Sequence, residues 1–366
     1  MHRRFFVTAA AALPMASALP TMAQTPAVRV FSPANGDWRS FEVVHKVELL
    51  NAAGGARIWV PLPVVEDGYQ RNITTRWNVS SGSAERSVDP LYGSALLSVV
   101  PDTKDTKPVI EVVTQLQTQS RRVDLSAPTG ATISAADARK WTAATQYMPT
   151  DGIVLQKALE ATKGRSSDLD RVRAIYDWTI ANTYRNVDTR GCGVGDVKAA
   201  LETSNFGGKC ADNNAIFVAL CRAVGIPARD IYGVRIAPSA FGYKELGAGS
   251  ANITRAQHCR AEAFIAGIGW VPADPADVGK VQRVETPEWI KTVDHPVVAP
   301  VHKALLGAWE GNWLAYNVAH DVVLPGAKGP KLAFLMYPQA ETAEGRLDPY
   351  DPDNFKYTIT TREIKA

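Results

Sequence analysis

Apolar residues in the first third of the chain follow a strand-like pattern. The stretches from Phe41 to Leu49 and from Val109 to Leu116 alternate apolar and polar residues or carry short apolar blocks. Gly, Pro, Asn and Asp separate such stretches, as turns between strands require. We therefore expect an all-β sandwich at residues 28–125.

The spacing of apolar residues becomes helical after a stretch rich in Ala, Thr and Ser, which we interpret as a linker at residues 126–150. Helical spacing, helix-capping residues and stop signals predict helices at 153–161, 167–183 and 210–224. Short apolar runs predict strands at 228–236, 257–266 and 269–274, with a β-like tail from 317 to 364. We expect residues 151–366 to form one catalytic domain that includes this tail.

The first 23 residues have the pattern of an export signal. A basic start with the pair Arg3-Arg4 precedes an apolar stretch that contains no Asp or Glu, and the arginine pair is typical of a twin-arginine signal. A retained membrane anchor is the alternative, but Pro14 and Pro20 interrupt the stretch, which is shorter than the about 20 residues of a spanning helix. We expect an exported protein, periplasmic or secreted, without a membrane span after signal removal.

The amino-acid composition excludes several classes of protein and partner. The chain of 366 residues is 46% hydrophobic and 21% charged, as in globular proteins. Lys and Arg number 40 against 37 Asp and Glu, and no block of like charges offers a footprint for nucleic acid, which we therefore do not expect as a partner. Four cysteines are too few for a disulfide scaffold. They gather between residues 192 and 259, which indicates a local role.

One of these cysteines has the surroundings of a nucleophile. Cys210 follows Gly207-Gly208-Lys209 and opens a predicted helix. The positive end of the helix dipole and the Lys209 cation favour the thiolate over the thiol. The glycines let a substrate approach the backbone, and the N–H group of Cys210 could hold the oxygen of a tetrahedral intermediate.

A thiolate nucleophile needs a proton carrier and a group that orients it. His258 and Asp274 are 16 residues apart, with a turn signal between them. A hairpin centred on Ala266 would place them opposite each other on one face of adjacent strands, and Pro275 would end the second strand. We expect Cys210 to be the nucleophile and His258 the base and then the acid, with Asp274 fixing the imidazole tautomer.

Four blocks of sequence resemble the core of the transglutaminase-like superfamily. They are Gly208-Lys209-Cys210, Leu220 to Arg229, His258-Cys259-Arg260-Ala261-Glu262-Ala263-Phe264 and Gly269-Trp270-Val271-Pro272-Ala273-Asp274-Pro275. The resemblance spans about residues 168–280. It implies a papain-like α+β fold, in which a helix bearing the cysteine packs on an antiparallel sheet, and a triad that falls on Cys210, His258 and Asp274. One difference is that Arg260 stands where many members have an aromatic residue.

These features together predict a thiol-dependent acyl-transfer enzyme that needs no cofactor and acts on a peptide or protein. Hydrolysis of a peptide or side-chain amide is favoured, since water is the default acceptor. A cross-linking transglutaminase and a non-catalytic envelope binding module are the alternatives. Strand alternation puts Arg260 and Glu262 on the face of His258, where they, with Lys209, could bind a substrate, although a surface ion pair explains Arg260 and Glu262 equally well.

The remaining cysteines have simpler interpretations. Cys221 lies among apolar residues of the predicted helix, which favours core packing. Cys192 and Cys259 form either a disulfide beside the site or two free thiols. A zinc site from Cys192, Cys210, Cys259 and His258 is the least favoured arrangement, because neither Cys-x-x-Cys nor His-Glu-x-x-His spacing occurs. We expect no metal.

Overall fold

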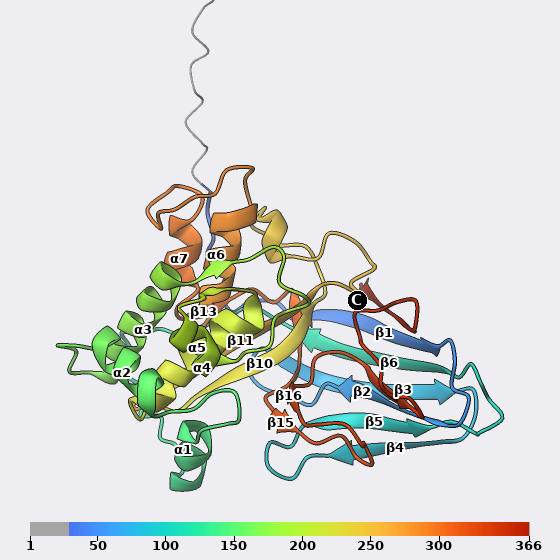
Figure 1. Ribbon diagram of the computed structural model, residues 1–366. Coiled ribbons are helices and arrows are strands. Elements are labelled where there is room, and N and C mark those ends of the chain that lie inside the picture. The colour runs from blue at the N-terminus through green and yellow to red at the C-terminus, as the bar shows by residue number, and fades with distance from the viewer. Residues whose placement is uncertain (1–28, 366) are drawn as a thin grey trace, which may run out of the picture.

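The computed structural model describes residues 29–365, so the predicted export signal lies outside the described residues. Most helices gather in one part of the molecule, around a smaller sheet, and the longest strands lie in another part (Figure 1). Within residues 29–365, no helix is both long and apolar enough to cross a membrane. The predicted α+β class is confirmed.

Two antiparallel sheets form a sandwich in the strand-rich part (Figure 1). Its strands are β1 (Arg39–Leu49), β2 (Ala56–Leu62), β3 (Gln70–Val79), β4 (Ser83–Val88), β5 (Ala95–Val100), β6 (Val109–Thr118), β17 (Gln339–Thr342), β18 (Gly345–Arg346) and β19 (Phe355–Ile364). The strand orders are β19-β1-β6-β3 and β18-β17-β2-β5-β4. Apolar side chains from both sheets, such as Val47, Ile58, Leu97 and Ile110, meet in a shared core.

The C-terminal strands belong to this sandwich, which differs from their expected grouping with the catalytic domain at residues 151–366. Strand β19 pairs with β1 along its whole length, from Phe355 opposite Leu49 to Ile364 opposite Ser40, and β17 pairs with β2. The short apolar runs of the tail identify strands but not their partners, since alternation alone fits any sheet with one buried face.

The other part contains seven α-helices within the described residues and a sheet of order β12-β11-β10-β14. The helices are α1 (Ala135–Thr142), α2 (Gly152–Ala161), α3 (Asp168–Asn182), α4 (Val197–Thr203), α5 (Cys210–Ala223), α6 (Pro275–Val284) and α7 (Ala299–Ala304), with a 3-10 turn η1 (Lys244–Leu246). The sheet strands are β10 (Ala228–Arg235), β11 (Gln257–Ile265), β12 (Gly269–Ala273) and β14 (Trp313–Asn317). Short strand pairs join β7 (Arg121–Arg122) to β13 (Ala308–Trp309), β8 (Tyr184–Arg185) to β9 (Gly207–Gly208), and β15 (His320–Val322) to β16 (Leu332–Phe334).

Helix α5 is the centre of this part. Every residue from Asn213 to Arg222 is buried, as expected for a helix that is covered on all sides. Strands β10 and β11 pack against it, as do α2, α3 and α6. Gly225 follows it with φ of 82°, a conformation that favours glycine and stops the helix. The predicted helices 153–161, 167–183 and 210–224 are confirmed to within one residue at each end.

The expected linker at residues 126–150 is partly ordered into helix α1. The Ser134 hydroxyl caps this helix by accepting the N–H of Asp137, and Trp141 is buried against the helical core. A third apolar cluster joins the two parts of the molecule. It includes Phe41 and Leu116 of the sandwich and Val234 and Leu314 of the helix-backed sheet.

We predict that Thr360→Pro in β19 lowers the free energy of unfolding by about 3 kcal/mol. The N–H groups of Ile359 and Thr361 point away from β1, toward Thr254 and Ala251, so the N–H of Thr360 faces β1 and would be lost. Thr360→Val, which keeps this N–H, is the matched control. Equal denaturation midpoints of the two variants in urea would show that the tail is not part of the sheet.

Candidate active site

Cys210 is held at the start of α5 by a network around Asp212. The Asp212 carboxylate accepts the N–H groups of Lys209 at 3.0 Å and of Val194 and Gly195 at 2.9 Å each. This ties the loop before α4 to the first turn of α5. The N–H of Cys210 itself has no acceptor within the described residues, which leaves it free to donate to a substrate oxygen.

The glycines before Cys210 have a structural reason that differs from the predicted approach of a substrate. A Cβ atom at Gly208 would lie 2.5 Å from the Cβ of Asp212, and one at Gly207 would lie 2.4 Å from the Tyr184 hydroxyl. Protein side chains, rather than an open cleft, therefore occupy the space at both positions, and the requirement for glycine is stricter at Gly208, because the Cβ of Asp212 cannot move without its backbone.

His258 and Asp274 come from the two ends of a hairpin, as the sequence predicted, but with a different register. Strands β11 and β12 pair Ala261 with Ala273 and Ile265 with Gly269, so the hairpin is centred on Gly267 rather than Ala266. Asp274 is consequently diagonal to His258 rather than opposite it. The side chains of His258 and Asp274 still lie on the same face of the sheet, because the observed pairing of β11 with β12 differs from the predicted pairing by two residues, an even number.

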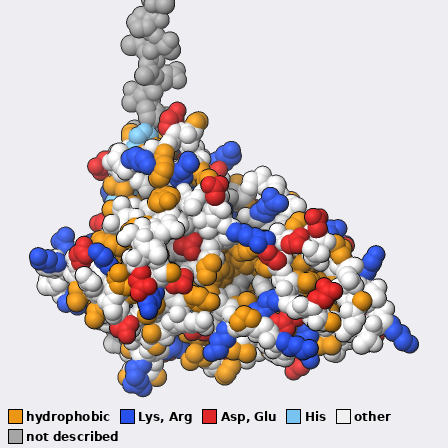
Figure 2. Space-filling model, in the orientation of Figure 1, with side chains coloured by type: hydrophobic (Ala, Val, Ile, Leu, Met, Phe, Trp, Pro, Cys, Tyr) orange, Lys and Arg blue, Asp and Glu red, His pale blue; other side chains and the backbone are white. Residues whose placement is uncertain are grey.

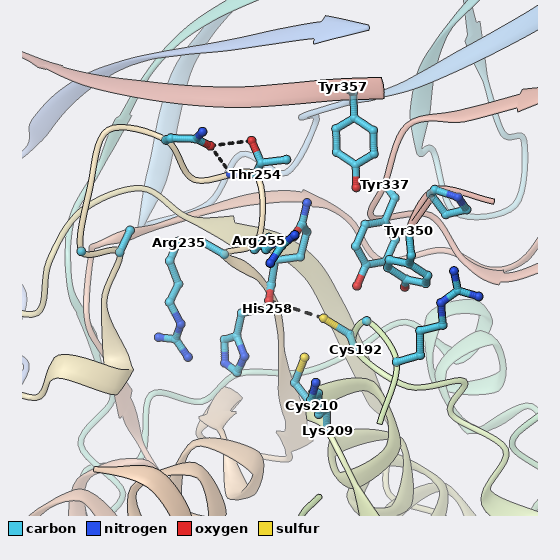
Figure 3. Close-up of a pocket in the computed structure, with 18 of the residues that line it drawn as sticks. Cys192, Lys209, Cys210, Arg235, Thr254, Arg255, His258, Tyr337, Tyr350 and Tyr357 are labelled. Atoms are coloured by element: carbon cyan, nitrogen blue, oxygen red, sulfur yellow. Dashed lines mark hydrogen bonds between the residues drawn. The ribbon is translucent and has the colours of Figure 1, made fainter. Parts of the chain in front are cut away.

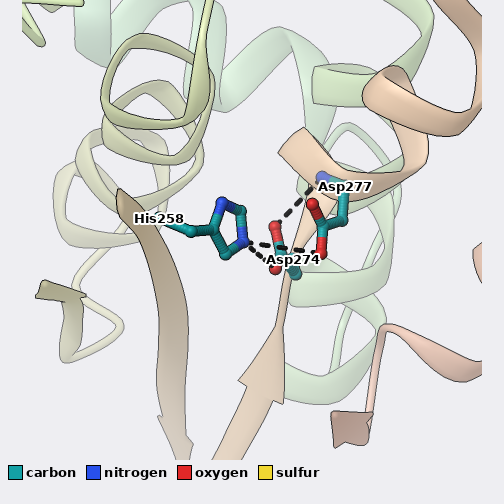
Figure 4. Close-up of side chains that lie close together, drawn as sticks. All are labelled: His258, Asp274 and Asp277. Atoms are coloured by element: carbon teal, nitrogen blue, oxygen red, sulfur yellow. Dashed lines mark hydrogen bonds and ion pairs between the residues drawn. The ribbon is translucent and has the colours of Figure 1, made fainter. Parts of the chain in front are cut away.

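Asp274 is the N-cap of α6, so Pro275 begins this helix rather than only ending a strand. Its carboxylate accepts the N–H of Asp277 at 3.1 Å. Nε2 of His258 lies 2.7 Å from Oδ2 of Asp274 and 3.5 Å from Oδ2 of Asp277 (Figure 4). This geometry leaves Nδ1 of His258 for an exchange of a proton with Cys210.

Sequence reasoning missed two polar residues that support this arrangement. Asn214 of α5 donates to the carbonyl of Cys259 at 2.9 Å and to Asp274 at 3.4 Å. Asp277 is buried and pairs with Arg235 at 2.5 Å. Asn214 lies one helical turn after Cys210, and Asp277 lies three residues after Asp274. Their helical spacing from Cys210 and Asp274 is the sequence signal that could have identified these two residues.

Charges around the site favour a thiolate beside an imidazolium. Burial and Arg235 lower the pKa of His258, but the carboxylates of Asp277 and Asp274 outweigh them and raise it. Hydrogen bonding from Cys192 and Cys259, together with His258, holds the pKa of Cys210 well below its usual range despite burial. The lowered thiol pKa and the raised imidazole pKa both stabilise the ion pair.

The other cysteines are free thiols. Of the two alternatives for Cys192 and Cys259, the structure has the unbridged one. Interaction with the Cys210 thiolate and burial raise the pKa of Cys192, and burial first and then Cys210 raise the pKa of Cys259. Negative charge therefore concentrates on Cys210. Cys221 is fully buried, and its prediction as a core residue is confirmed.

A cavity of about 590 Å³ opens over Cys210 and His258. Figure 2 shows the molecular surface hollowed between the helical part and the sandwich. Residues 247–257 form part of its lining, and the C-terminal tail supplies Tyr337, Tyr350, Phe355 and Tyr357 (Figure 3). The sequence did not predict these tail residues at the site, because their proximity depends on the pairing of β19 with β1.

Of the predicted substrate-binding residues, only Lys209 lines this cavity. The guanidinium of Arg260 is buried over the rings of Trp309 and Trp313 and donates to the Glu310 carbonyl at 2.9 Å. Glu262 is fully buried and pairs with Arg121 and Arg229. Strand alternation gave their face correctly, but β7 and the segment 309–313 cover that face, so neither reaches the cavity or forms a surface ion pair.

One group of possible metal ligands lies within the described residues. His258, Asp274 and Asp277 offer ligand atoms within 4.8 Å of one another. The guanidinium of Arg235 already pairs with Asp277, and that of Arg260 lies 3.8 Å from Asp274. These two cations would repel a metal ion, so the arrangement suits a proton-transfer network better.

We predict that Glu262→Gln lowers the free energy of unfolding by about 3 kcal/mol, because it leaves two partly buried arginines, Arg121 and Arg229, without their carboxylate. The alkylation rate of Cys210 should not change, because Glu262 does not reach the cavity. Glu363→Gln, which removes only the exposed pair with Arg39, should cost less than about 1 kcal/mol. A stable Glu262→Gln protein with slowed alkylation would instead assign Glu262 to the site.

Known proteins are similar to this chain in sequence or in fold. The model of the transglutaminase-like superfamily matches residues 156–275. An uncharacterized protein of Haemophilus influenzae is 32% identical over 357 residues, which cover 90% of this chain and 93% of the relative. A crystal structure from Cytophaga hutchinsonii, described as a "putative cysteine protease", aligns with a TM-score of 0.55 at 14% identity, over 90% of this chain and 99% of that one.

The periplasmic domain of TgpA from Pseudomonas aeruginosa is more distant, with a TM-score of 0.35 at 14% identity over 68% of this chain and 91% of that one. The family match, the relative that aligns along most of the chain and the shared fold agree with the sequence blocks around Cys210, His258 and Asp274. The chain belongs to the transglutaminase-like superfamily.

Proposed function

We propose that the protein is a thiol-dependent acyl-transfer enzyme with Cys210, His258 and Asp274 as its catalytic triad. The observation that carries the proposal is that Cys210 and His258 both line the cavity, while Asp274 holds His258 through a hydrogen bond of 2.7 Å. The lowered pKa of Cys210 and the raised pKa of His258 support a thiolate that is ready to attack.

The reaction follows from the positions of the groups. Sγ of Cys210 attacks an amide carbonyl, and the oxygen that becomes negative accepts the N–H of Cys210. His258 then gives its Nδ1 proton to the leaving amine, while Asp274 holds Nε2. In the second half, His258 takes a proton from water, which attacks the thioester and releases a carboxylate.

Hydrolysis is the favoured outcome, with a peptide or side-chain amide as substrate. The cavity beside Cys210 is bordered by exposed residues such as Arg190 and Arg255, so water can reach a thioester. The basic leader with Arg3-Arg4 supports export to the periplasm or beyond. A cross-linking reaction would use the same thioester with an amine as acceptor.

The test uses p-nitrophenyl acetate, an acyl donor that needs little binding energy. We expect a burst of p-nitrophenolate equal to the enzyme concentration, followed by turnover. Cys210→Ala should abolish the burst, and His258→Ala should slow it at least about 100-fold, because the imidazolium that keeps Cys210 as a thiolate is lost. Cys221→Ala is the matched control, since Cys221 lies buried in the same helix away from the cavity.

The fate of the acetyl group distinguishes the reactions. With cadaverine present, acetate as the main product indicates a hydrolase, and N-acetylcadaverine indicates a transamidase. Incorporation of a labelled amine into a protein acceptor would support cross-linking. An unreactive Cys210 in the folded protein would contradict the enzyme and favour the binding-module alternative.

A further inference from the structure

The charged side chains that line the cavity over Cys210 are cationic. Among the described residues that line it there are six cationic side chains and no Asp or Glu. The cationic residues are Arg185, Arg190, Lys209, Arg235, Arg255 and Lys280. Nothing in the net charge of +3 for the whole chain predicts such a concentration, so the charge is a property of this site.

Half of these cations are neutralised from outside the cavity. Arg235 pairs with Asp277 at 2.5 Å, Lys280 pairs with Glu245 at 3.3 Å, and Arg190 pairs with Asp348 at 2.5 Å. For Arg185, Lys209 and Arg255, residues 29–365 provide no carboxylate at ion-pair distance. These three residues are called the unpaired cations below.

The unpaired cations come from different parts of the fold. Arg185 of β8 pairs in register with Gly208, which places it next to Lys209 and the start of α5. Arg255 belongs to the segment that β19 holds through Thr254. Burial and then Arg185 lower the pKa of Lys209, and the nearby Cys192, Cys210 and Asp188 raise it by less, so the two cations repel each other and are only partly compensated. An anion in the cavity would relieve this repulsion.

Tyrosine rings line the side of the cavity that faces Arg235 and His258. Figure 3 shows Tyr337, Tyr350 and Tyr357 across the cavity from Arg235 and His258, with Cys210 and Lys209 at its base. The rings of Tyr337 and Tyr350 pack edge to face, with centroids 5.0 Å apart. Phenol rings offer a flat apolar surface and hydroxyl donors, a combination that suits the backbone and methylene groups of a peptide.

We propose that this cavity selects an acidic peptide, whose carboxylates are bound by Arg185, Lys209 and Arg255 close to the amide that Cys210 attacks. This inference rests on the proposed function. It adds the substrate class, since the triad by itself does not distinguish acidic from neutral or basic peptides. The tyrosine side holds the uncharged part of the same peptide.

The first experiment compares two alkylating reagents of similar size on the folded protein. Iodoacetate and iodoacetamide react alike, forming a bond from Sγ to carbon and releasing iodide, but only iodoacetate is an anion. We expect the ratio of the iodoacetate rate to the iodoacetamide rate at Cys210, measured by peptide mapping, to exceed that of glutathione at least about five-fold. About 0.5 M NaCl should remove most of this excess.

Variants assign the effect to the unpaired cations. Arg185→Gln and Arg255→Gln should each lower the ratio about two-fold or more, and the iodoacetamide rate corrects for any change in thiolate content. Arg86→Gln, an exposed arginine of β4 outside the cavity lining, should leave the ratio unchanged. A ratio equal to that of glutathione in the parent protein would overturn the proposal. A slow iodoacetamide reaction would instead contradict the proposed function.

A protection experiment separates an acidic peptide from other anions. Acetyl-tetraglutamate amide should slow iodoacetamide alkylation of Cys210 at a concentration at least about ten-fold lower than acetyl-tetraglutamine amide. Inorganic phosphate serves as the small-anion probe and should protect only weakly, because it cannot contact the tyrosine side. Equal protection by the two peptides, or stronger protection by phosphate, would contradict an acidic peptide as the substrate.

Discussion

The hydrogen bond from Nε2 of His258 to Asp274 is the interaction on which the rest of the site depends. It joins the start of β11 to the N-cap of α6, and both groups are nearly or fully buried. A buried bond of this kind is short and geometrically strict, so it transmits the register of the hairpin directly to the imidazole ring. It also decides that Nδ1, rather than Nε2, is left for Cys210.

The surrounding fold can be understood as support for that bond. Asn214 connects α5, which carries Cys210, to both β11 and Asp274, so the nucleophile and its base share one rigid frame. Buried carboxylates and arginines balance each other around the frame, and Arg235 compensates Asp277. In the cavity above, Arg185, Lys209 and Arg255 lack such a carboxylate partner among residues 29–365, whereas the other three cations are paired. We assign these three unpaired cations to a ligand.

The pattern of apolar and polar residues predicted the features that depend on neighbouring residues in the sequence. The bounds of α5 follow from its apolar residues and from Gly225, and the common face of His258 and Asp274 follows from the even spacing of a hairpin. The sequence could not reveal what depends on distant pairing. For Arg260 and Glu262 the sequence allows a substrate contact or a surface ion pair, and both predictions are wrong because alternation says nothing about what covers a strand face. The tyrosines of the tail were missed because β19 finds β1 across more than 300 residues of chain.

The measurement that tests the central claim most directly is the pH profile of iodoacetamide alkylation at Cys210 in the folded protein. An ordinary thiol has a pKa of about 8.5 and loses about ten-fold in rate per pH unit below it. Because the pKa of Cys210 is lowered and that of His258 is raised, we predict a rate that keeps its high-pH value to lower pH than an ordinary thiol does and falls off only well below about pH 8.5. His258→Ala should restore the ordinary profile. A parent protein that already follows the ordinary thiol profile would contradict the thiolate-imidazolium pair and the account built on it.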